Sequence, residues 1–137
     1  MSSVTLQALL ICDQVIQDSQ SSKKTLVGIF DKIFSKQFPA LHPRFAVFTR
    51  FRCEPGKRVS TGYRITGPSG LNAEIGRPND LDVGASGYVE IVSVFEGFPI
   101  PAPGEYSFTL LVNGKEIASA LVTVLFHEEG TPAATES

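Results

Sequence analysis

Apolar and polar positions alternate over short stretches along most of the chain, and the clearest alternation surrounds one turn near its end. Asn113 and Gly114 separate two runs rich in β-branched and aromatic residues. This dipeptide favours a two-residue type I′ turn, because both of its positions need a positive φ. The pattern therefore predicts that residues 103–126 form a β-hairpin.

The predicted turn also determines which residues of the hairpin face each other. One face of its first strand carries Tyr106, Phe108 and Leu110, and we expect this stripe to be buried against a second sheet. In the second strand the apolar residues change faces, which indicates a β-bulge near Ala120 or burial on both faces. The expected pairs are Val112–Lys115, Leu110–Ile117, Phe108–Ser119 and Tyr106–Leu121.

Similar short runs, separated by turn signals at intervals of about 8 to 12 residues, predict further strands. Residues 44–53 and 59–65 alternate most clearly, and we interpret them as adjacent strands joined by a turn at residues 54–57. The pattern favours an all-β fold, a two-sheet antiparallel sandwich of immunoglobulin-like type with seven or eight strands. The remaining expected strands are residues 4–12, 25–34, 71–75 and 87–95, and the expected connections are residues 19–24, 35–43, 76–86 and 96–104.

The length of 137 residues suits one domain, which buries roughly two-thirds of its unfolded surface without disulfides or metals. We assign residues 4–126 to a single sandwich and the polar residues 127–137 to a disordered tail. The sequence shows neither a signal peptide nor a membrane span, so we expect a cytoplasmic protein. Cys12 and Cys53 are then expected as reduced, buried thiols, with one disulfide across the sandwich as the alternative.

Three segments, taken in order, carry a resemblance to a known family. They are GIFDKIF at residues 28–34, FPALHPRF at residues 38–45 and PGEYSFTLLVNGKEIA at residues 103–118. Together they resemble a family of small bacterial domains of unknown function. The resemblance implies a compact β-sandwich of bacterial origin, and it implies no activity, cofactor or catalytic residue.

The residue types needed for catalysis or metal binding are sparse. His42 precedes a proline in a predicted loop and His127 opens the predicted tail, so neither has an evident nucleophile beside it. Asp80 and Asp82 form the one acidic loop cluster. That cluster is a calcium site only if other loops add carboxylates, and otherwise it is solvated surface. We therefore expect no cofactor and no metal.

Charge is divided unevenly between the two parts of the chain. Residues 23–64 carry ten Lys and Arg against Asp31 and Glu54, a net charge of +8. From residue 65 onward, Arg77 and Lys115 oppose ten acidic residues, a net charge of −8. Such asymmetry indicates a surface that attracts a partner of opposite charge.

The basic residues of the two clearest strands share one parity. Arg50, Arg52, Arg58 and Arg64 fall on the outward face together with Phe48. If the two strands are adjacent, these side chains form one cationic surface for an acidic protein or for the acidic half of a second copy. The alternative is a solvated sheet face whose charges prevent edge association.

These patterns favour a non-enzymatic binding or scaffolding domain that acts through protein–protein contact. A small enzyme with an unrecognised site, and a binder of anionic ligands or nucleic acid through the basic face, are the alternatives. The net acidic composition and the lack of a run of aromatic residues for base stacking argue against nucleic acid.

Overall fold

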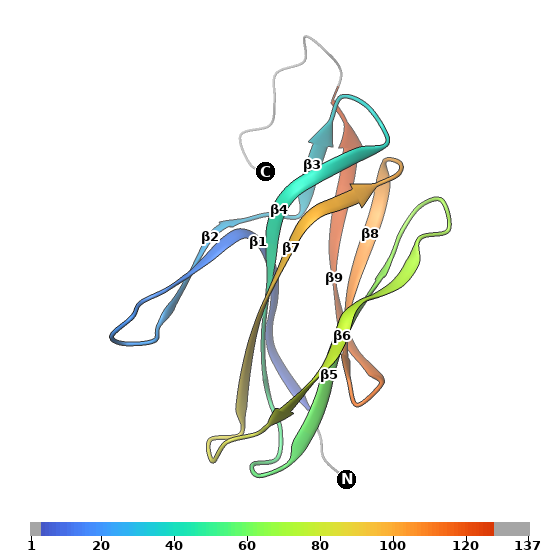
Figure 1. Ribbon diagram of the computed structural model, residues 1–137. Coiled ribbons are helices and arrows are strands. Elements are labelled where there is room, and N and C mark those ends of the chain that lie inside the picture. The colour runs from blue at the N-terminus through green and yellow to red at the C-terminus, as the bar shows by residue number, and fades with distance from the viewer. Residues whose placement is uncertain (1–3, 128–137) are drawn as a thin grey trace.

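The computed structural model describes residues 4–127, and for residues 76–79 it describes the backbone alone. Over this range the chain forms nine strands, which are labelled in Figure 1. The strands are β1 (Thr5–Gln17), β2 (Lys24–Ile29), β3 (Lys32–Ser35), β4 (Ala40–Arg52), β5 (Arg58–Thr66), β6 (Asn72–Asp82), β7 (Tyr88–Ile100), β8 (Gly104–Val112) and β9 (Lys115–Phe126).

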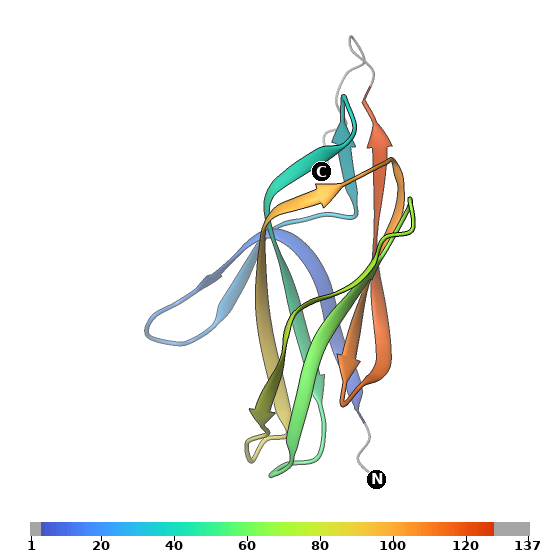
Figure 2. The same cartoon turned by 45° about the vertical axis from the view of Figure 1, so that its right-hand side comes forward.

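The strands form two sheets that face each other. Sheet A has the order β2-β1-β4-β7, and sheet B has the order β3-β9-β8-β5-β6. Neighbouring strands are antiparallel, except that β3 runs parallel to β9. The prediction of a two-sheet, immunoglobulin-like sandwich is thereby confirmed, with nine strands instead of seven or eight. The paired ends of β1 and β2 form an arm that extends from the sandwich in both views (Figures 1 and 2).

The additional strand comes from residues 25–34, which we predicted as a single strand. Residues 30 and 31 instead carry the chain from sheet A to sheet B, so that β2 and β3 belong to different sheets. On one side Phe30 N donates to Ile11 O at 3.0 Å, and on the other Thr123 N donates to Asp31 O at 2.9 Å. Two backbone hydrogen bonds therefore hold this crossover in place.

Three predicted connections are partly strand. β6 runs through much of the expected loop at residues 76–86, β4 begins at Ala40, before Pro43, and β7 continues to Ile100. In each case a long neighbouring strand supplies the pairing: β5 pairs with β6, and β4 pairs with β7 over nearly its whole length. Pairing with a neighbour outweighs the weak strand propensity of these segments.

The hairpin of β8 and β9 is confirmed, and its register differs from the prediction. Asn113 and Gly114 have φ values of 51° and 78°, as a type I′ turn requires. Val112 pairs with Lys115 as expected, but Leu110 pairs with Ala118, because the register shifts at this point. The extra residue is Ile117, so the bulge lies three residues before the expected position.

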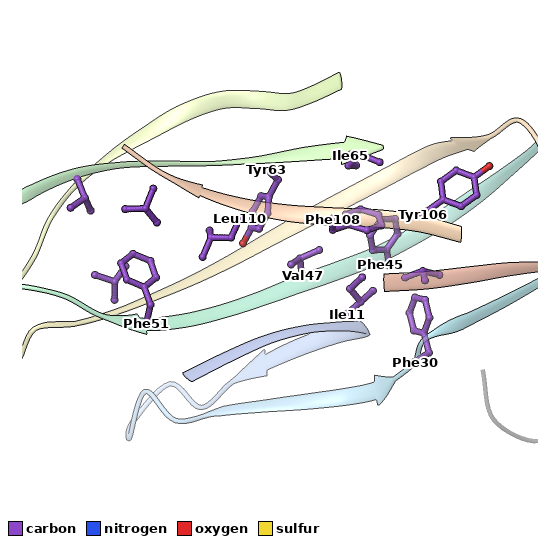
Figure 3. Packing of buried hydrophobic residues seen from close by; sticks show 14 of the residues in the cluster. Ile11, Phe30, Phe45, Val47, Phe51, Tyr63, Ile65, Tyr106, Phe108 and Leu110 are labelled. Atoms are coloured by element: carbon purple, nitrogen blue, oxygen red, sulfur yellow. The ribbon is translucent and has the colours of Figure 1, made fainter. Parts of the chain in front are cut away.

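The core lies between the sheets and is rich in aromatic side chains (Figure 3). Tyr106, Phe108 and Leu110 are all buried, which confirms the predicted stripe. Phe108 packs edge-on against Phe45 of sheet A, with ring centroids 5.6 Å apart. The Tyr106 hydroxyl donates to Ala102 O at 2.6 Å, a bond to backbone just upstream that resembles the tyrosine corner of immunoglobulin-like domains.

The expected hairpin of β4 and β5 is wrong. β4 belongs to sheet A and β5 to sheet B, so residues 53–57 cross between the sheets instead of reversing the chain within one. The facing strands are still joined inside the core, where Thr49 of β4 hydrogen-bonds to the Tyr63 hydroxyl of β5. The prediction of which residues of the two strands face inward was therefore right, and the prediction that the two strands pair with each other was wrong.

Candidate functional site

The structure does not bring the four predicted arginines together. Arg50 and Arg52 lie on β4 in sheet A, whereas Arg58 and Arg64 lie on β5 in sheet B. Outward-facing residues of the two sheets of a sandwich point in opposite directions. The prediction of a single basic surface is therefore wrong. That either pair of arginines binds a partner stays a prediction.

The basic and acidic parts of the chain neutralise each other within the molecule. All but one of the ion pairs among the described residues join a basic residue before position 65 to an acidic residue after it, and the exception is Lys57–Glu54. The acidic strands pair with or lie near the basic ones, so the separation along the sequence disappears in the fold. The strongest contacts of the predicted arginines are Arg50–Glu90, Arg58–Asp82 and Arg64–Glu116.

The other members of the predicted basic face also have partners. The guanidinium of Arg52 lies 5.6 Å from the ring centroid of Tyr88, and that of Arg50 lies 4.4 Å from it. Phe48, which we expected to be exposed, is only 8% exposed. It pairs with Leu10 on one side and Val92 on the other, so it lies in an apolar strip across the outer face of sheet A.

Asp80 and Asp82 lie on β6 instead of in a loop, and both are within 4.0 Å of Arg58. The Asp82 carboxylate accepts a hydrogen bond from Arg58 at 3.0 Å. Across the part of the chain that the structure describes, no three His, Cys, Asp or Glu side chains gather where they could hold a metal. These two aspartates therefore pair with a cation of the protein itself.

His42 and the two cysteines are packed among apolar groups. The His42 ring contacts Phe30 and Phe45, with ring centroids 5.8 and 5.6 Å away. Burial lowers the pKa of His42, so the ring is favoured in its neutral form. Cys12 and Cys53 are free and buried, and burial raises the pKa of both thiols. Each cysteine is thus a poor nucleophile at neutral pH.

An accessible hollow lies on the side of the sandwich where β1 of sheet A and β9 of sheet B approach each other. It is a cleft of about 390 Å³ below the crossover from β2 to β3. Its lining consists of residues 9–11 of β1, residues 29–31 of the crossover and residues 120–121 of β9. Asp31 is the single charged residue among these, and every other side chain of the lining is apolar.

Large apolar side chains at this cleft are exposed to solvent. Ile29 is 56% exposed, Leu121 is 50% exposed and Leu10 is 37% exposed. We call this region the open side of the sandwich. It consists of the cleft and of the first halves of β1 and β9, which lie side by side in Figures 1 and 2. Apolar groups gathered at one place on a surface are typical of interaction sites.

The open side is not apparent from alternation, because residues 25–34 resemble a single strand and give no sign of the crossover at residues 30 and 31. One signal was present in the sequence. Residues 4–12 and 117–126 contain no charged side chain, whereas each of the strands β4 to β7 carries charges. A long uncharged strand at a sheet edge is unusual unless something covers it.

The two facing, mostly antiparallel sheets define the chain as an immunoglobulin-like domain. Residues 7–125 match the model of a family of unknown function, DUF6941, and the chain belongs to this family. No curated protein matches the sequence. The described part of the chain contains no helix that is long and apolar enough to span a membrane.

Two solved structures are similar to this chain. One is the alkylpurine DNA glycosylase AlkC of Pseudomonas fluorescens bound to DNA containing an abasic site analog, with 16% identity and a TM-score of 0.53. The match covers 88% of this chain and 30% of the glycosylase, so the chain spans less than a third of that protein. The other is an immunoglobulin-like protein of Pseudomonas aeruginosa, with 12% identity and a TM-score of 0.38, covering 90% of this chain and 97% of that one.

Proposed function

We propose that this chain is a non-enzymatic binding or scaffolding domain that acts through protein–protein contact. The observation that carries the proposal is the open side, where Leu10, Ile29 and Leu121 expose apolar surface around an apolar cleft. Exposing such side chains to water is unfavourable by roughly 25 cal/mol for each Å². A protein partner that covers them gains this free energy.

The basic face predicted from the sequence is no longer part of the proposal. Its arginines are divided between the two sheets, and most of them pair with carboxylates of the same chain. For the same reason we do not propose that this chain contacts DNA as the glycosylase does. The two proteins are similar in fold. Phosphate groups of a nucleic acid would have to compete with these carboxylates for the arginines.

The proposal is tested by comparing what variants capture from a lysate of the organism that encodes the protein. The test variant carries Ile29→Lys and Leu121→Lys, which place two charges at the cleft. The control carries Leu41→Lys, a charge at a side chain that is 69% exposed and does not line the cleft. Substitutions of exposed residues usually change stability by about 0.5 kcal/mol or less, so the thermal midpoints of all three proteins should agree.

We expect quantitative mass spectrometry to show a set of proteins captured by the wild type and by Leu41→Lys and lost from the double variant. The same set captured by all three proteins would contradict the proposal, because the open side would then have no role. Capture of no protein above background by the wild type would contradict it as well.

A further inference from the structure

The strands at the open side are paired along only part of their length. β2 pairs with β1 from Cys12 to Gln17, which leaves residues 5–10 of β1 without a neighbour on that side among the described residues. β3 pairs with β9 from Thr123 to Phe126, which likewise leaves residues 115–122 of β9 paired with β8 alone. Two unpaired half-edges, one from each sheet, thus flank the cleft.

The direction of the backbone groups along β9 follows from its bond to the crossover. Thr123 N donates to Asp31 O, so the amide and carbonyl of Thr123 point away from β8. The pairing of β8 with β9 is regular from Ser119 to Thr123, and backbone groups of alternate residues point to the same side of a strand. Ser119 and Leu121 therefore direct their amides and carbonyls toward the open side.

From residue 117 onward, this half-edge lacks the charges and prolines found on the edge strands β6 and β7. Residues 117–126 contain no charged side chain and no proline. The edge strands β6 and β7, in contrast, each contain at least two acidic residues and one proline. Exposed edges are normally protected by charges, prolines or bulges against pairing with other chains. On β9 the bulge at Ile117 limits the regular edge to residues 118–122 and does not remove it.

We propose that the open side binds an extended peptide segment of a partner protein, which adds as a strand to residues 118–122 of β9 below β3. This inference rests on the proposed function and specifies the partner. Strand addition supplies main-chain hydrogen bonds to Ser119 and Leu121, and alternate side chains of the peptide enter the cleft between the sheets. The peptide has apolar residues at alternate positions.

The shape and charge of the cleft favour such a segment over a second copy of the chain. A second copy that paired with β9 edge to edge would keep its own sheet outside the sandwich and leave Ile29, which is 56% exposed, uncovered. An extended segment can lie along β9 at the cleft and cover this residue. Because Asp31 is the one charged residue of the lining, a basic residue in the peptide is favoured beside the apolar positions.

The test selects heptapeptides from a random library displayed on phage, using the full chain as the target. We expect the selected peptides to combine alternating apolar residues with a Lys or Arg. Their binding should be lost in Leu121→Lys and kept in Leu41→Lys. In the complex, hydrogen exchange at the amides of Ser119 and Leu121 should slow, because those amides gain hydrogen-bond partners.

A second measurement separates strand addition from other binding and involves no change to the protein. The best selected peptide is synthesised in versions with one N-methyl group at each successive position. If the peptide adds to β9, methylation should weaken binding at every second position, by about 2- to 10-fold for each lost hydrogen bond, and should have little effect at the positions between. Equal effects at successive positions would overturn the inference.

The remaining outcomes also decide the question. Peptides that bind without slowing exchange at Ser119 and Leu121 would overturn strand addition and leave the proposed protein-binding function standing. Slow exchange at these amides in the concentrated free protein, together with a dimer in sedimentation, would assign the edge to a second copy and overturn the inference. Selection of no peptide at all would overturn it too, while the lysate comparison would still test the proposed function by itself.

Discussion

The two long sides of the sandwich expose strand edges in different ways. On the open side, residues 4–12 of the chain and residues 117–122 of β9 carry no charge and lie beside a cleft lined by apolar side chains and Asp31. On the other, which we call the acidic side, the edge strands β6 and β7 carry carboxylates that bind arginines of the neighbouring strands β5 and β4. Charged residues on an edge strand discourage pairing with other chains. The difference indicates that one side is protected and the other is available.

The connections between the sheets differ in the same way. Next to the acidic side, the chain crosses between the sheets at residues 53–57 and again at residues 83–87, and the two crossings are hydrogen-bonded to each other. Val83 N donates to Lys57 O at 2.8 Å, and Cys53 N donates to Gly87 O at 2.8 Å. On the open side, the chain crosses between the sheets at residues 30–31. This crossing separates the second halves of β1 and β9, which pair with β2 and β3, from their first halves, which pair with neither.

The largest expected effect is on the interior that both sides share. Phe108→Ala should lower the free energy of unfolding by about 3–5 kcal/mol, because it removes a buried ring that packs on Phe45, Phe95 and Phe98 and leaves a cavity. Urea denaturation with a fitted midpoint measures the change. A midpoint close to that of the wild type would show that this ring does not hold the two sheets together.

A smaller effect is expected at the acidic side. Gly87 has a φ of 80°, and a side chain there would place its Cβ 2.7 Å from the Cys53 carbonyl oxygen. Gly87→Ala should therefore cost about 1–3 kcal/mol through backbone strain and loss of the tie between the crossings. Gly84→Ala is the matched control in the same connection, because its Cβ would meet no atom within 4 Å. Equal denaturation midpoints for the two variants would show that the tie is unimportant.

The smallest effect concerns the charges that protect the acidic side. Glu90 on β7 pairs with Lys24 of the arm and with Arg50 of β4. The hydrogen bond from Lys24, followed by that from Arg50, holds the pKa of Glu90 below its ordinary value of 4.5. A carboxylate with a lowered pKa in the folded state stabilises the protein above the unfolded-state pKa, and this contribution is lost as the pH falls through the folded-state value.

Glu90→Gln should accordingly lower stability by about 1 kcal/mol or less at neutral pH, because the pair is near the surface. Its deficit relative to the wild type should shrink as the pH falls below about 4.5. Glu54→Gln is a control, since the ion pair of Glu54 with Lys57 is long, at 4.0 Å, and both side chains are exposed. Thermal melts between pH 3 and pH 7 measure both variants, and a deficit that grows toward low pH would contradict the assignment.

Much of this protein could be predicted from local patterns. The Asn113-Gly114 hairpin, the buried stripe of Tyr106, Phe108 and Leu110 and the all-β class follow from turn chemistry and from alternation. Both signals act between residues that are close in the sequence. A two-residue turn with positive φ values forces the chain back on itself, and alternation assigns one face of each strand to the interior.

Apart from the pairing of β8 with β9, these signals did not determine which strands are neighbours. Alternation showed which faces of β4 and β5 are buried, and a five-residue connection can either reverse the chain within a sheet or cross to the facing one. The crossing at residues 53–57 separates Arg50 from Arg58, brings acidic strands beside both, and so removes the basic surface that the sequence suggested. The open side likewise depends on how far β2 extends along β1 and how far β3 extends along β9. Pairing between segments that are distant in the sequence determines these lengths, and alternation within a strand does not predict them.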